Sequence, residues 1–270
     1  MGNQYFRLKL DIEKAKELYN LGLTQKEVGK KLETTQRIIQ SRFREINFKS
    51  RIYLKKEIIQ QNSHTDYIHF IKDIDEKTKQ ILLGSLFGDG SIRMRLGGIS
   101  PQYVECHQLR QSDYLNWKIT YFKKYLGGKL SIVNKHSTPV ANYVSNALIN
   151  LFYFYKLFYP YGKKELTKEL LQKLDWQGIA VWYVDDGTFD YSGKRIAFTM
   201  DKKFHNICIE YFKELGFFFK LSYPNSLAIR LSTKQTKKFI KNIESYIFEM
   251  PKCVHYKIGL NKYEKNAINN

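Results

Sequence analysis

Two apolar segments that end in Asp-Gly constrain the fold of this chain more than any other feature. Residues 82–90 read LLGSLFGDG, and residues 179–187 read IAVWYVDDG. Glycine directly after a helix is a common end signal, so each segment predicts a buried helix whose last turn carries a carboxylate, Asp89 or Asp186. A single copy indicates a core helix with a glycine cap. Two copies favour a paired acidic site.

The sequence after each motif predicts the same order of elements. After the first motif we expect strands near 91–96 and 102–110, a helix over 113–126, strands near 129–135 and 141–145, and a helix over 148–158. After the second we expect a strand near 195–200, a helix over 203–215, strands near 218–223 and 226–232, and a helix over 234–248. These patterns predict an α+β chain with two similar halves. Gly84, Gly88 and Ala180 would let the two motif helices approach closely.

Carboxylates at two neighbouring helix ends offer the oxygen ligands that Mg²⁺ prefers, and Mn²⁺ or Ca²⁺ can occupy the same kind of site. The backbone carbonyls of Gly88 and Asp185 are candidates to complete it. A cation held there lowers the pKa of a bound water and neutralises charge on a phosphodiester. We expect the Asp185 side chain to be a structural or hydrogen-bonding neighbour rather than a third catalytic acid.

The charge of the chain indicates a polyanionic partner. Lysine and arginine number 45 against 26 acidic residues, a formal net charge of +19, which favours nucleic acid first and an anionic membrane surface second. The apolar segments are too short to span a membrane, and Cys106, Cys208 and Cys253 lack zinc-site spacing. We therefore expect no membrane association and a reducing compartment. The expected location is the cytoplasm or nucleoid of a bacterium or phage-infected cell, with an organellar origin as the alternative.

Residues 11–46 predict three short helices in a pattern that resembles a helix-turn-helix. A capping box over 24–27 begins the second helix, and the third directs Ile38, Ile39 and Phe43 inward. The candidate DNA contacts on the third helix are Thr35, Gln36, Arg37 and Gln40. The alternative is a small helical cap with a solvated basic face. We expect a DNA-binding domain over residues 1–50 and a linker over 51–73.

The two motifs resemble the paired motifs of LAGLIDADG homing endonucleases in their monomeric, two-repeat form. The resemblance covers residues 75–260, including the lead-in at 160–167 and a closing segment at 250–258. It implies a pseudo-twofold pair of αββαββα repeats, over 74–160 and 161–270. Their saddle-shaped antiparallel sheets would lie in the DNA major groove, with both acids over the minor groove.

The resemblance also implies roles for individual residues. Asp89 and Asp186 would be the metal-binding catalytic acids, Lys257 would organise water in one active site, and Gln108 would support a metal-bound water. Thr199 would take the place of Gln108 in the second half. The lysine of the first half is left open between Lys129 and Lys135.

Alternation along the expected strands directs a set of polar side chains to one face of each sheet. The candidate DNA contacts are Arg93, Arg95, Gln102, His107 and Arg110 in the first half, and Lys194, Arg195, Asn225 and Arg230 in the second. Arginine and amide side chains suit base edges in the major groove. The alternative for each of them is a solvated strand face.

These observations predict a Mg²⁺-dependent, site-specific double-strand DNA endonuclease of the homing class. We expect it to act as a monomer on a long, asymmetric target. Two alternatives stay open, a transcriptional regulator that binds DNA without cleavage and a maturase that binds intron RNA. The presence of both acids and Lys257 argues against the regulator.

Overall fold

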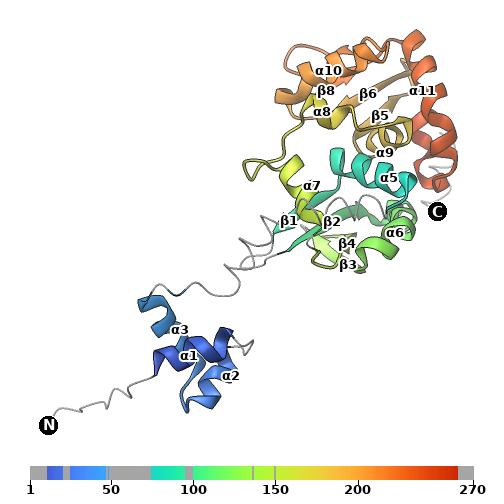
Figure 1. The fold of residues 1–270 in the computed structure, drawn as a ribbon. Coiled ribbons are helices and arrows are strands. Elements are labelled where there is room, and N and C mark those ends of the chain that lie inside the picture. Colours follow the sequence, from blue (N-terminus) through green and yellow to red (C-terminus); the bar gives the residue numbers. More distant parts are fainter. Residues whose placement is uncertain are drawn as a thin grey trace. The chain divides into compact units, whose positions relative to one another are not determined.

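A computed structural model describes residues 11–20, 25–46, 48, 74–94, 100–135, 137–148 and 150–260. The chain forms two compact units, Met1–Asn62 and Ser63–Asn270, and each is described by itself (Figure 1). The division falls within the segment 51–73 that the sequence indicates as a linker. All of that linker, Thr24 of the expected capping box and Arg95 lie outside the described residues. None of the described helices combines the length and the apolar character that a membrane span requires.

The described part of the N-terminal unit contains three helices: α1 (Ile12–Asn20), α2 (Gln25–Lys31) and α3 (Gln36–Glu45). Their small core contains Ala15, Val28, Ile39 and Phe43. The expectation that Ile38 faces inward is wrong, because its side chain is 45% exposed.

The turn between α2 and α3 is tight. A Cβ on Gly29 would lie 2.9 Å from the carbonyl oxygen of Thr34, so the backbone can approach there only because glycine lacks a side chain. Thr35 then caps α3, its hydroxyl accepting from the backbone N–H of Ile38 at 3.3 Å.

The second unit contains two copies of the same fold. The first copy consists of α5 (Glu76–Phe87), β1 (Ser91–Met94), β2 (Pro101–Gln108), α6 (Ser112–Leu126), β3 (Lys129–Lys135), β4 (Thr138–Val144) and α7 (Leu151–Phe158). After α8 (Lys168–Leu171), the second consists of α9 (Trp176–Asp186), β5 (Gly187–Asp190), β6 (Arg195–Thr199), α10 (His205–Glu214), β7 (Lys220–Leu221), β8 (Ala228–Arg230) and α11 (Thr233–Phe248). The sheets have the orders β1-β2-β4-β3 and β5-β6-β8-β7, with every pair antiparallel. The predicted pair of αββαββα repeats is confirmed.

The helices α5 and α9 lie side by side at the centre of this unit (Figure 1). Equivalent aspartates begin them: Asp75 accepts from the backbone N–H of Thr78 at 2.8 Å, and Asp175 from that of Gly178 at 2.9 Å. A Cβ on Gly84 would lie 2.3 Å from the carbonyl oxygen of Gly178. Close approach therefore depends on one glycine from each helix, with Gly178 rather than Ala180 on the α9 side.

We expect Gly84→Ala to lower the free energy of unfolding by about 1–3 kcal/mol, because the new methyl group would meet backbone that cannot move aside. Alanine is otherwise the better helix former, so propensity alone predicts the opposite sign. Chemical denaturation measures the difference, with Asn116→Ala on the exposed face of α6 as the control. A neutral or stabilising Gly84→Ala would show that the two helices have room to separate.

Candidate active site

The crossing of α5 and α9 brings the two motif ends into contact. A Cβ on Gly88 would lie 2.4 Å from the Cβ of Asp185, so glycine is required there. The backbone N–H of Asp89 donates to Oδ2 of Asp185 at 3.3 Å. The Asp89 side chain is 42% exposed, whereas that of Asp185 is buried. Asp185 is thus a hydrogen-bonding neighbour of Asp89, as the sequence predicts.

Asp186 is the last residue of α9, and it lies near the charges of Asp89 and Asp185. The indole N–H of Trp182 donates to its Oδ2 at 3.2 Å and orients the carboxylate. Burial, followed by the nearby charges of Asp185 and Asp89, raises the pKa of Asp186 to about 7. A divalent cation would stabilise the ionised form of Asp186, which the charges of Asp185 and Asp89 destabilise. Carboxylate oxygens are the ligands that Mg²⁺ and Mn²⁺ prefer, so Asp186 and its acidic neighbours suit a divalent cation.

A buried charge network contacts Asp89, the acid of the first motif, through Asp185. Nζ of Lys118 donates to both oxygens of Asp185, at 2.8 and 2.9 Å, and to Oε1 of Glu105 at 2.5 Å. The Tyr114 hydroxyl also donates to Asp185, at 2.9 Å. All three charged side chains are fully buried. Burial lowers the pKa of Lys118, but Asp185 and Glu105 outweigh it and the net shift is upward, so Lys118 stays charged.

His107 belongs to this network and not to the exposed face of the sheet. Its Nε2 lies 2.7 Å from Oε1 of Glu105, and its Nδ1 lies 3.7 Å from Oδ2 of Asp89. The expectation that His107 and Gln102 lie on an exposed DNA-reading face is wrong, because both are buried. The alternation of β2 turns His107 inward, and the Gln102 amide donates to the Ser145 carbonyl at 2.8 Å.

Two lysines contact backbone carbonyls next to the motif acids. Nζ of Lys257 donates to the Gly187 carbonyl at 2.5 Å, and Nζ of Lys164 donates to the Gly88 and Phe87 carbonyls at 3.0 and 3.2 Å. Burial lowers the pKa of both lysines against the opposing effect of the acids. The Gly88 carbonyl, a predicted metal ligand, thus already accepts from an ammonium group.

The structure does not bring Lys129 or Lys135 to the acids. Both are exposed on β3, at the opposite edge of the sheet from β1. Lys164 lies near the acids instead, with its Nζ on the Gly88 carbonyl.

Strand register decides which residue of the second half matches Gln108. Ser91 pairs with Val104, and the equivalent Thr188 pairs with Ala197. Counting onward from these pairs, Gln108 corresponds to Asp201. Both residues immediately precede a short 3₁₀ helix, Leu109–Gln111 or Lys202–Phe204. The assignment of Thr199 as the counterpart is therefore wrong.

A hollow of about 460 Å³ lies beside Asp186. Its lining includes Lys164, Thr199, Asp201 and Lys203. Gln108 itself is exposed at the end of β2, on the face opposite His107, and its support of a metal-bound water stays a prediction.

The remaining DNA-contact candidates of the two sheets differ in their exposure to solvent and in whether they form an ion pair. Arg93, Arg110, Lys194 and Asn225 are exposed, and Arg230 is half-buried on β8. Arg195 is half-buried and forms an ion pair with Asp190 at 3.2 Å.

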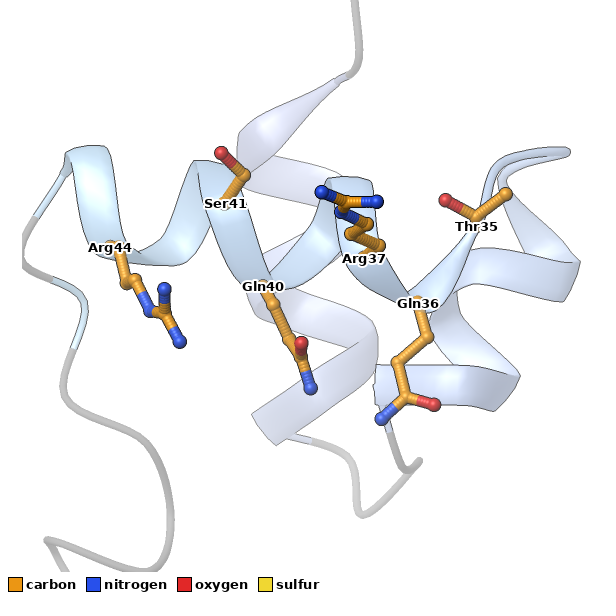
Figure 2. A pocket seen from close by; sticks show the side chains of 6 residues that line it. All are labelled: Thr35, Gln36, Arg37, Gln40, Ser41 and Arg44. Atoms are coloured by element: carbon orange, nitrogen blue, oxygen red, sulfur yellow. The ribbon is translucent and has the colours of Figure 1, made fainter.

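In the N-terminal unit, the four predicted contacts lie together on the outer side of α3. Thr35, Gln36, Arg37 and Gln40 line one surface hollow with Ser41 and Arg44. Figure 2 shows Gln36, Gln40 and Arg44 projecting from the same side of the helix.

Sequence reasoning missed Glu105, Lys118 and Lys164, although the first two leave a trace. Glu105 is two residues from both Tyr103 and His107 in β2, so all three lie on the same face. The sequence thus places polar groups on the buried face of a strand. Lys118 lies on the buried face of α6 between Tyr114 and Phe122. Charge on an otherwise apolar face is a signal for a buried network.

Comparison with known proteins gives the family. A model of the LAGLIDADG DNA endonuclease family matches residues 79–243. DNA endonuclease I-ChuI of Chlamydomonas applanata is 26% identical over 183 residues, covering 63% of this chain and 80% of that protein. The cytochrome b mRNA maturase bI2 of Debaryomyces hansenii is 26% identical over 146 residues, covering 49% and 54%. The chain belongs to the LAGLIDADG DNA endonuclease family.

Similarity also extends to longer proteins and to a solved structure. Protein RecA of Mycobacterium leprae is 30% identical over 127 residues, which cover 46% of this chain but only 17% of that protein. The structure of the homing endonuclease I-WcaI bound to its DNA recognition sequence superimposes with a TM-score of 0.58 at 16% identity, covering 68% of this chain and 87% of that one. This second likeness supports the fold.

Proposed function

We propose that this protein is a site-specific double-strand DNA endonuclease of the homing class that depends on a divalent metal. The observation that carries the proposal is the duplicated arrangement at the helix crossing. Each motif ends in an acid, Asp89 or Asp186, and a lysine contacts a carbonyl next to each acid, the half-buried Lys164 at Gly88 and the buried Lys257 at Gly187. Two acids with a lysine beside each suit the cleavage of two strands. The net charge of +19 suits a duplex substrate.

In this proposal Asp89 and Asp186 would each hold a divalent metal ion, Mg²⁺ or Mn²⁺. The metal would lower the pKa of the attacking water and neutralise charge that develops on the phosphodiester. The protein groups prepare the site: Trp182 orients Asp186, and Lys118 fixes Asp185, which receives the Asp89 N–H. The ammonium groups of Lys164 and Lys257 add positive charge beside the acids, where a phosphate would lie.

Selection followed by cleavage tests this function and identifies the target in the same experiment. Duplexes that the full-length protein retains from a random library in Ca²⁺ are transferred to Mg²⁺, and the products are sequenced. We expect both strands to be cut at a fixed position in one long, asymmetric sequence. Retention of a defined sequence without any cleavage in Mg²⁺ or Mn²⁺ would favour the DNA-binding regulator instead.

We further propose that α3 extends the DNA contact on one side of the target. We expect Arg37→Ala combined with Arg44→Ala to weaken binding about 10–100-fold and to shorten the footprint at one end, because two cations on the exposed face are removed. The cleavage rate at saturating protein should stay unchanged. The control is Lys14→Ala combined with Lys16→Ala, which removes the same charge from α1. Equal losses in both double variants, with an unchanged footprint, would contradict a reading role for α3.

Intron RNA is the second candidate substrate, favoured by the similarity to the maturase bI2. Competition binding separates the two. If the selected duplex displaces structured intron RNA at equal concentration, the endonuclease is the primary function. Preferential retention of the RNA would make maturation the primary function.

A further inference from the structure

The inference concerns His107, whose imidazole is held in one orientation and one tautomer. Glu105 accepts from Lys118 at 2.5 Å and contacts Nε2 of His107 at 2.7 Å. Lys118 and Glu105 form an ion pair in which both side chains are fully buried, so Glu105 is ionised. An ionised carboxylate can only accept, which places a proton on Nε2. The lone pair of a neutral ring then lies on Nδ1.

That Nδ1 faces the acid of the first motif. Its distance to Oδ2 of Asp89 is 3.7 Å. This is too long for a hydrogen bond, but within a few tenths of an ångström of the ~3.0–3.4 Å that separates two ligands of one cation with bonds of about 2.1 Å. Ligand atoms of Asp89, His107 and Asp185 all lie within 4.8 Å of one another. The His107 side chain is 2% exposed, so its orientation is set by the protein.

The arrangement of a buried carboxylate, a histidine and an open nitrogen is the one by which proteins orient metal-binding imidazoles. We propose that His107 is a ligand of the cation held by Asp89, so that the first-half metal site contains a nitrogen donor. The inference rests on the proposed function only in that it concerns the same Asp89 site. Asp185 acts as a positioning residue, because its oxygens already accept from Lys118, Tyr114 and the Asp89 N–H.

The second half lacks this donor. The register that matches Gln108 with Asp201 matches His107 with Met200 and Glu105 with Phe198. The Asp186 site therefore offers oxygen donors where the Asp89 site adds an imidazole. Imidazole favours Mn²⁺ and Co²⁺ over Mg²⁺. The two metal sites should therefore be inequivalent, with the first-half site binding the transition metal more tightly.

Pulsed electron paramagnetic resonance with Mn²⁺ alone tests this on the full-length protein. We expect ¹⁴N coupling to the first equivalent of bound Mn²⁺. His107→Met, which copies the second half, should abolish the coupling and weaken Mn²⁺ binding about tenfold or more. The control is His205→Met, a buried histidine of the second half, which should keep both. Coupling that is absent from the wild type, or that persists in His107→Met, overturns the proposal.

A second variant covers the case in which His107→Met does not fold. Asp89→Asn retains the histidine but removes the charged oxygen ligand, so the ¹⁴N coupling should also disappear; coupling that persists there overturns the proposal. Failure of this inference and failure of the proposed function are distinguishable. Site-specific cleavage without ¹⁴N coupling would overturn the inference alone, whereas coupling without cleavage would overturn the proposed function alone.

Discussion

Asp89→Asn and Asp186→Asn are each expected to lower the rate of double-strand cleavage about a thousandfold or more, with DNA binding retained. Each substitution keeps the shape of the side chain but removes a charge that would hold the metal, which is worth several kcal/mol in the transition state. Because Asp186 is the last residue of α9 and Asp89 follows the end of a different helix, α5, each single variant should still nick one strand.

The strand that is cut distinguishes the two variants. Single-turnover cleavage of a duplex labelled differently on each strand gives the two rates separately. Asp113→Asn, an exposed acid in the first turn of α6, is the control and should cut both strands normally. Equal slowing of both strands by one single variant would contradict the assignment of one acid to each site.

Lys118→Met is expected to lower the free energy of unfolding by about 3–5 kcal/mol, because it leaves two carboxylates buried without their counter-ion. Lys118 is fully buried and bonded to both Glu105 and Asp185. Denaturation by guanidinium chloride measures the loss. Neutralising the partners with Glu105→Gln and Asp185→Asn in the same chain should restore most of it, since the cost comes from unpaired charge. A loss below about 1 kcal/mol would show that water reaches the network.

The pH dependence of this loss gives an independent check. In the wild type the pKa of Glu105 is lowered to about 2, so its contribution to stability is present above its ordinary pKa and disappears as the pH falls toward 2. In Lys118→Met, burial raises the pKa of Glu105. Protonation of this carboxyl then removes the free energy cost of a buried, unpaired charge. The stability gap between the two proteins should therefore narrow as the pH falls from about 7 toward about 4. A stability difference that does not change with pH would show that the loss comes from packing and not from unpaired charge.

The fold followed from the sequence because its strongest signals are local. A helical apolar run, a final acid and a glycine specify each motif helix, and their repetition after similar spacing specifies two halves. Gly84 already indicated a close helix crossing, and the structure shows its contact with Gly178. The third helix of the N-terminal unit was predicted with the correct core residues Ile39 and Phe43.

The candidate site was only partly predictable, because its geometry depends on strand register and distant pairing. Side chains of a strand alternate between its two faces, and the sequence alone did not show that His107 lies on the buried face of β2. The hairpin between Ser91 and Val104 is longer than the one between Thr188 and Ala197. This difference in length is why Asp201, and not Thr199, corresponds to Gln108.

The buried network had no local pattern to reveal its partners. Lys118 and Asp185 are 67 residues apart in the sequence and meet only through the packing of α6 beside the helix crossing. Lys164 lies in a segment that the sequence marks as a lead-in to the second motif, with nothing to show that its ammonium reaches the end of the first.

The most direct measurement of the central claim is anomalous diffraction from crystals of the full-length protein with its selected duplex and Mn²⁺. The claim is that the two motif acids hold metal at the helix crossing, against the DNA. We expect manganese peaks within about 2.3 Å of carboxylate oxygens of both Asp89 and Asp186, next to a backbone phosphate. Manganese elsewhere on the protein, with neither acid in contact with it, would contradict the account.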